Sequence, residues 1–104
     1  MKNIILIPFC FESLVMYHKL KIKGYNVISF FDKNIYLQGK IYESMDGKCR
    51  IETMWRCYNS QVIICKKAVE DEIKKSLMLA GFDERELVSL NDCDIDVNEM
   101  SVLN

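Results

Sequence analysis

The sequence predicts a three-layer α/β domain with a mostly parallel sheet of about five strands. One observation is a strand–helix–strand pattern from Asn3 to Asp32, which has the length of a single βαβ unit. Another is a second apolar run, Gln61 to Cys65, followed directly by an amphipathic helical pattern from Lys66 to Ala80. Buried strands that alternate with helices favour a parallel sheet covered on both faces.

Composition and charge fit one soluble domain. The chain has 104 residues, of which 50% are hydrophobic, with four glycines, one proline and a formal net charge of −1. Basic residues form no patch interleaved with aromatic side chains, so nucleic acid is not an expected partner. The apolar runs are too short for a membrane span, and Met1 leads directly into a strand rather than a signal peptide. We therefore expect a cytoplasmic protein without a membrane partner.

Two parallel strands are expected in the first third of the chain. Residues 3–7 are a continuous run of isoleucine and leucine after Asn3, typical of a strand buried on both faces, and Pro8 ends it. Tyr25 to Phe31 has the same character and is followed by Asp32 at its tip. The right-handed crossover rule makes these two strands parallel.

A helix is expected between these strands, from about Ser13 to Lys23. Ser13 or Glu12 would stand near its start, and Gly24 would follow its last turn. Its basic side chains and the histidine of the chain are expected mostly on the exposed face: His18, Lys19, Lys21 and Lys23.

After Asp32 a loop is expected over residues 33–48. A buried strand is expected at 61–65, the clearest helix at 66–80 and a last short strand at 87–90. Short extended pieces are expected at 41–42 and 49–54, and a turn from Trp55 to Ser60. Counted along the chain, the strand order should be 3-2-1-4-5. The domain would then cover residues 1–91, and the acidic residues 92–104 would be a tail or a truncated linker.

The cysteines predict neither disulfides nor a metal site. They are odd in number, form no CxxC pair and lie far from His18 in the sequence: Cys10, Cys49, Cys57, Cys65 and Cys93. We expect reduced cysteines that pack as small apolar residues. No catalytic residue is predicted, and His18 is interpreted as a surface histidine because only lysines lie within one helical turn of it.

The turn after the first strand is the candidate binding site. In dinucleotide-binding units a G-x-G-x-x-G turn holds a pyrophosphate at a helix N-terminus, and an acidic residue about 20 positions later holds the ribose. Here Pro8, Cys10 and Ser13 stand at the glycine positions, and Asp32 follows Ser13 by 19 residues. The candidate cofactor-binding residues at this edge of the sheet are Phe9, Cys10, Phe11, Glu12, Ser13, Asp32, Cys65 and Lys66.

The side chains of Cys10 and Ser13 would keep a pyrophosphate away from the backbone. The leading hypothesis is therefore a Rossmann-like fold whose nucleotide site is degenerate, with NAD(P) or a nucleotide sugar as the ligand if one binds. Two alternatives stay open. Cys10 at a helix N-terminus could act as a nucleophile, and in this the chain looks like the IIB phosphocysteine carriers of the sugar phosphotransferase system. A protein-interaction domain would instead use Trp55, Tyr58 and the acidic tail.

Several segments resemble a known module. They are residues 3–20, Val27-Ile28-Ser29-Phe30-Phe31-Asp32-Lys33-Asn34, Leu37-Gln38-Gly39-Lys40, Val62-Ile63-Ile64-Cys65 and Leu77-Met78-Leu79-Ala80-Gly81-Phe82. They are similar to the N-terminal Rossmann-like module of bacterial surface-polysaccharide proteins, including nucleoside-diphosphate-sugar epimerases and dehydratases, sugar O-acyltransferases and FkbM-type methyltransferases. The resemblance implies a nucleotide-binding turn at Pro8 to Ser13, a ribose-binding acid at Asp32 and catalysis by a separate downstream domain. It leaves the oligomeric state open.

Overall fold

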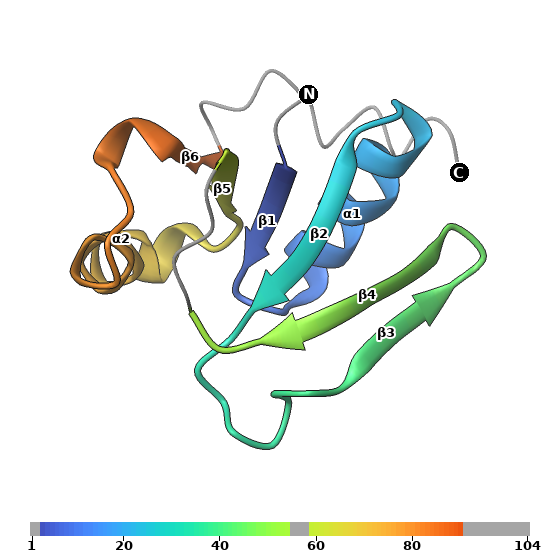
Figure 1. Cartoon of the computed structure of the whole chain (residues 1–104), viewed down its shortest axis with the longest axis horizontal. Coiled ribbons are helices and arrows are strands. Elements are labelled where there is room, and N and C mark those ends of the chain that lie inside the picture. Colours follow the sequence, from blue (N-terminus) through green and yellow to red (C-terminus); the bar gives the residue numbers. More distant parts are fainter. Residues whose placement is uncertain (1–2, 55–58, 91–104) are drawn as a thin grey trace.

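The computed structural model describes residues 3–54 and 59–90 and shows an α/β fold built on one six-stranded sheet (Figure 1). The strands are β1 (Asn3–Ile7), β2 (Asn26–Phe31), β3 (Ile41–Ser44), β4 (Gly47–Glu52), β5 (Ser60–Ile64) and β6 (Leu87–Ser89). The helices are α1 (Phe11–Ile22) and α2 (Glu70–Leu79), with 3-10 turns η1 (Lys67–Val69) and η2 (Glu84–Glu86). Residues 55–58 of the turn predicted from Trp55 to Ser60, together with Cys57, Cys93 and the acidic tail, lie outside the described residues, and Ser60 belongs to β5.

The sheet runs in the order β3-β4-β2-β1-β5-β6, and all of its pairs are parallel except β3 with β4. The extended piece expected at 49–54 is β4, and the order 3-2-1-4-5 agrees with the five parallel strands when this piece is counted as the third strand. The expectation of about five strands and of a loop over residues 33–48 was incomplete. Residues 41–52 form an antiparallel hairpin in which Ser44 pairs with Gly47, leaving Met45 and Asp46 as the turn. Gly47 has a φ of 128°, which favours glycine.

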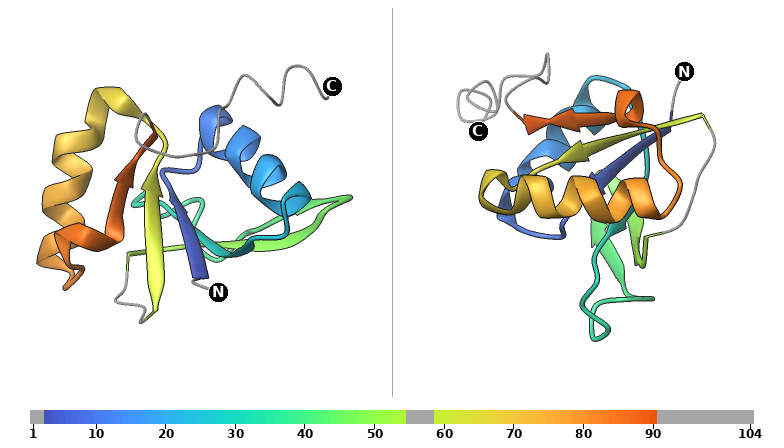
Figure 2. Two further views of the ribbon diagram at one scale, coloured as in Figure 1. Left: turned by 90° about the horizontal axis from the view of Figure 1, so that it is seen from above. Right: turned by 90° about the vertical axis from the view of Figure 1, so that its left-hand side faces the viewer.

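The two helices pack against opposite faces of the sheet, as Figure 2 shows for α1 and α2. Along β1 the side chains alternate between the two cores, because successive residues of a strand point to opposite faces. Ile4 and Leu6 join the core under α1, whereas Ile5 and Ile7 join the core under α2. All four are buried, which explains the continuous apolar run in the sequence.

Helix α1 begins two residues earlier than predicted, at Phe11, with Cys10 as its N-cap residue. The reason is local: the hydroxyl of Ser13 lies inside the first turn and bonds back to Cys10 rather than capping a later start. The helix ends as expected before Gly24, which has a φ of 85°. Lys19 was placed wrongly on the exposed face, since only 1% of it is accessible.

Helix α2 is shorter than predicted at its start. Val69, the N-cap residue, has a φ of −118° and a ψ of 16°, so the chain passes through the 3-10 turn η1 before the α-helix begins. Gly81 follows the helix with a φ of 105°, and Phe82 folds back into the core beside Phe31, with 6.2 Å between ring centroids. Among the described helices, none is long and apolar enough to cross a membrane.

Candidate functional site

The residues predicted to bind a cofactor lie where three parallel strands end. Phe9 to Ser13 connect β1 to α1, Asp32 follows β2, and Cys65 and Lys66 follow β5. Hydrogen bonds join these segments directly: the N–H of Cys65 donates to the carbonyl of Ile7 across 2.7 Å. The structure thus gathers the predicted segments at the carboxyl edge of the sheet, on both sides of β1 (Figure 1).

Both carboxylate oxygens of Asp32 are engaged by the protein's own backbone. Oδ2 accepts from the N–H of Phe9 at 3.0 Å, and Oδ1 accepts from the N–H of Asn34 at 2.9 Å. The main chain of Asp32 is held as well, because its carbonyl accepts from the side-chain amide of Gln38 at 3.1 Å and its N–H donates to the carbonyl of Glu52 at 2.9 Å. Asp32 therefore fastens the β1–α1 turn to the end of β2.

Cys10 and Ser13 close the first turn of α1. The N–H of Cys10 donates to Ser13 Oγ across 2.9 Å, and the same hydroxyl donates to the carbonyl of Cys10 across 2.9 Å. Ser13 is fully buried. Together with the Phe9–Asp32 bond, these contacts occupy two consecutive backbone N–H groups of the turn. A glycine-rich turn would leave such groups for a phosphate.

The thiol of Cys10 is not activated. Burial raises the pKa of Cys10, and the nearby Glu12 carboxylate adds to this rise, whereas hydrogen bonds from Ser13 act in the opposite direction. The hydrogen bond with the same thiol, together with the charge of Lys66, lowers the pKa of Glu12. A nucleophilic cysteine needs a pKa that is lowered, so these surroundings do not support the phosphocysteine alternative.

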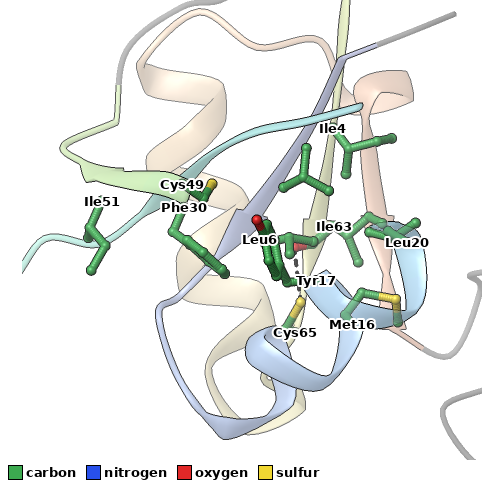
Figure 3. Packing of buried hydrophobic residues seen from close by; sticks show 11 residues of the cluster. Ile4, Leu6, Met16, Tyr17, Leu20, Phe30, Cys49, Ile51, Ile63 and Cys65 are labelled. Atoms are coloured by element: carbon green, nitrogen blue, oxygen red, sulfur yellow. Dashed lines mark hydrogen bonds between the residues drawn. The ribbon is translucent and has the colours of Figure 1, made fainter. Parts of the chain in front are cut away.

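Of the two residues after β5, only Lys66 faces solvent. Cys65 is fully buried, and its Sγ lies 3.5 Å from the carbonyl oxygen of Ile63 in the core under α1 (Figure 3). Cys49 lies in the same core, with 3% exposure, and burial raises the pKa of its thiol to about 11. Both residues pack as apolar groups, and within residues 3–54 and 59–90 no three His, Cys, Asp or Glu side chains gather as a metal site would require.

Sequence reasoning missed a second polar constellation, which joins α1 to the β3–β4 hairpin. His18 Nδ1 contacts the carboxylate of Asp46, and His18 Nε2 lies 2.8 Å from the hydroxyl of Tyr42. His18 was interpreted as a surface histidine with only lysines within one helical turn, and this interpretation did not include its partners on the hairpin. Its partners stand 24 and 28 residues away in the chain. The Asp46-Gly47 pair, a turn signal between two extended pieces, is the feature that could have revealed the hairpin and with it these contacts.

An aromatic cluster surrounds this constellation. The ring of Tyr42 lies within 6.0 Å, centroid to centroid, of the rings of four neighbours: Phe9, Tyr17, His18 and Phe30. The Tyr17 ring is fully buried against Phe30 (Figure 3), and its hydroxyl has no hydrogen-bond partner among the described residues. Phe9 belongs both to this cluster and to the turn that Asp32 holds.

Comparison of the chain with models of known families, with curated protein sequences and with solved structures found no significant match.

Proposed function

We propose that the chain is a three-layer, Rossmann-like module whose nucleotide site is closed by its own side chains. It would serve as a non-catalytic, nucleotide- or nucleotide-sugar-binding-like part of a polysaccharide-biosynthesis protein. The observation that carries this proposal is the hydrogen bond between the Phe9 N–H and the Asp32 carboxylate.

The strand order supports the Rossmann-like part of the proposal. The chain fills the sheet outward from β1 through β2 and β4, and then crosses to the opposite side of β1 to form β5 and β6. The order reverses between β1 and β5, and in open α/β sheets a ligand binds at the carboxyl edge beside such a reversal. The β1–α1 turn, Asp32 and Lys66 all lie at that edge.

The contacts at this edge support a closed site. In a working dinucleotide site the acidic residue is available to the ribose, and the N–H groups of the turn are available to the pyrophosphate. Here the N–H of Phe9 donates to the carboxylate of Asp32, so both groups already have a hydrogen-bond partner within the protein. A ligand that used either group would first have to break a charge-assisted hydrogen bond, which is worth about 1.5–3 kcal/mol and corresponds to roughly a tenfold to hundredfold loss of affinity.

The link to surface-polysaccharide proteins rests on the resemblance of residues 3–20, 27–40, 62–65 and 77–82 to their N-terminal modules. In such proteins catalysis belongs to another domain, which agrees with the absence of an activated nucleophile at Cys10. The expected role is that of a scaffold that retains the fold of a nucleotide-binding unit, with no turnover of its own.

Calorimetric titration tests this proposal. NAD⁺ and UDP-glucose, each raised to 5 mM against the whole chain, should give no saturable heat and no shift in thermal unfolding. A dissociation constant of about 50 μM would instead stabilise the fold by about 2.7 kcal/mol at this concentration. Saturable binding that Asp32→Ala weakens, in a variant whose circular dichroism matches the original chain, would show that the site is functional and would refute the closed-site proposal.

A further inference from the structure

The second constellation places three groups in the order of a proton relay. Asp46 lies in the turn of the β3–β4 hairpin, His18 lies in the middle of α1 and Tyr42 lies on β3. A carboxylate can only accept hydrogen bonds, so the Asp46 contact fixes the proton of neutral His18 on Nδ1. Nε2 then carries the lone pair and accepts from the Tyr42 hydroxyl across 2.8 Å. This distance lies within the range required of a general base.

Solvent reaches all three residues. The side chains of His18 and Asp46 are 28% and 36% exposed, and Tyr42 is half-buried. The inner side of the constellation is apolar by contrast, because Tyr17 and Phe30 are fully buried beneath it. The constellation thus lies at the surface of the domain, and the rings behind the phenol hold Tyr42 in place.

We propose that Asp46, His18 and Tyr42 form a nucleophilic site at which the Tyr42 oxygen accepts an acyl group from an activated acyl donor, such as an aryl ester or a thioester. Tyrosine is one of the side chains that form covalent intermediates when an adjacent base takes their proton. The site is separate from the carboxyl edge of the sheet and does not depend on the function proposed for that edge.

The chemical step is an acyl transfer. Tyr42 Oη attacks the carbonyl carbon and its proton passes to His18 Nε2, while Asp46 stabilises the imidazolium that forms. The bond from the carbonyl carbon to the leaving group then breaks, and the leaving group departs with the bonding electron pair. His18 returns the proton to the leaving group, which leaves an O-acyl tyrosine and a neutral imidazole.

The test compares two tyrosines of the same chain. Tyr36 serves as the internal reference because it is 78% exposed and lies outside the constellation. N-acetylimidazole is added to the whole protein at pH 7.5, and O-acetylation of each tyrosine is followed by peptide mass spectrometry, with hydroxylamine reversal to identify the ester. We expect Tyr42 to react at least about tenfold faster than Tyr36, since general-base assistance is typically worth a hundredfold or more and part of it is offset by partial burial.

Variants distinguish proton transfer to His18 from a purely structural contact between α1 and the β3–β4 hairpin. His18→Gln keeps a polar side chain but removes the base, and should bring the Tyr42 rate to or below that of Tyr36. Asp46→Asn keeps the shape and should give an intermediate rate. Circular dichroism and a cooperative urea transition verify the fold of each, and the Tyr36 rate reports the reactivity of the reagent. A Tyr42 that reacts no faster than Tyr36 in the original chain, or equally fast in a folded His18→Gln protein, would overturn the proposal.

Discussion

The backbone N–H of Phe9 donates to the carboxylate of Asp32, 23 residues further along the chain, at a distance of 3.0 Å. The bond joins the turn after β1 to the tip of β2 at the carboxyl edge of the sheet. The ring of Phe9 extends the connection, because its centroid lies 5.0 Å from that of Phe30 and 6.0 Å from that of Tyr42. One residue thus belongs both to the closed carboxyl edge and to the aromatic cluster.

Asp32→Ala should destabilise the fold by about 1.5–3 kcal/mol, because the N–H groups of Phe9 and Asn34 lose a charged acceptor. The lower part of this range is expected, since Asp32 is only half-buried. Asp32→Asn keeps one acceptor oxygen, so its free energy of unfolding should fall by about half as much. Urea unfolding measures both, with the exposed aspartate variant Asp71→Asn as control. Equal stability of Asp32→Ala and Asp71→Asn would contradict the fastening role of Asp32.

Ser13→Ala should cost about 1–2 kcal/mol, because its buried hydroxyl both accepts from and donates to the backbone of Cys10. Ser76→Ala is the matched control on α2. The hydroxyl of Ser76 donates to the carbonyl of Glu72 within the helix, and alanine is the better helix former, so its removal should change stability by no more than about 0.5 kcal/mol. Chemical denaturation measures the free energy of unfolding of both variants. A larger loss in Ser76→Ala than in Ser13→Ala would show that the Ser13 hydroxyl does not stabilise the first turn of α1.

Two tyrosine-to-phenylalanine changes should have opposite effects. The Tyr17 hydroxyl is buried without a described partner, so Tyr17→Phe should be neutral or stabilising by up to about 1 kcal/mol. The Tyr42 hydroxyl bonds His18, so Tyr42→Phe should cost about 0.5–1.5 kcal/mol. Unfolding free energies in urea test the contrast. A loss larger than 1 kcal/mol in Tyr17→Phe would mean that its hydroxyl has a partner in solution.

The stability of the protein should fall at alkaline pH, partly through Cys49. Burial raises its pKa from 9.0 to about 11 in the folded chain. The unfolded state therefore loses this proton first. The stabilisation is complete below about pH 9 and is lost as the pH rises toward 11, by about 2–3 kcal/mol in all.

Urea unfolding at pH 8 and pH 10.5 measures this loss. Cys49→Ala removes the titrating group. Its free energy of unfolding should therefore decrease less between pH 8 and pH 10.5 than that of the original chain. The pKa of Tyr17 is also raised by burial and by the charge of Cys49, so both proteins also carry Tyr17→Phe, which removes the contribution of Tyr17. The same alkaline decrease in both would show that Cys49 does not contribute.

Cys10 should react slowly with iodoacetamide. Its pKa is raised by burial and by Glu12, so at pH 8 less of it is thiolate than of a simple thiol such as glutathione. Glu12→Gln should accelerate the reaction by removing the carboxylate. Peptide mass spectrometry reports the rate at this residue alone. A Cys10 that outpaces glutathione would revive the phosphocysteine alternative.

The sequence alone predicted the parallel core well. The strand predicted at residues 3–7 has those bounds in the structure, and the run predicted at 61–65 is β5, Ser60–Ile64. These strands are buried on both faces, so burial alone makes their sequences continuously apolar, and the pattern is easily recognised. Glycines with positive φ, Gly24 and Gly81, likewise marked the helix ends.

The polar contacts were harder to predict, because they join residues that no local pattern connects. Asp32 was identified from its position at a strand tip, but its bond to Phe9 depends on how the turn after β1 bends. The His18 contacts depend on a hairpin whose strand β3 alternates between exposed and half-buried positions. A strand of four residues such as β3 leaves too short a pattern to distinguish from a loop.

The hairpin also forms one margin of the sheet. The central strands β2, β1 and β5 are rich in isoleucine, valine and phenylalanine, and at an open edge they would be a template for strand addition and aggregation. The outermost strand is instead the short β3, where Glu43 forms an ion pair with Lys48 at 3.9 Å. At the opposite edge stands β6, only three residues long and preceded by Glu84 and Glu86. The short, charged β3 at one margin and the three-residue β6, preceded by acidic residues, at the other leave little open edge on which another chain could add a strand.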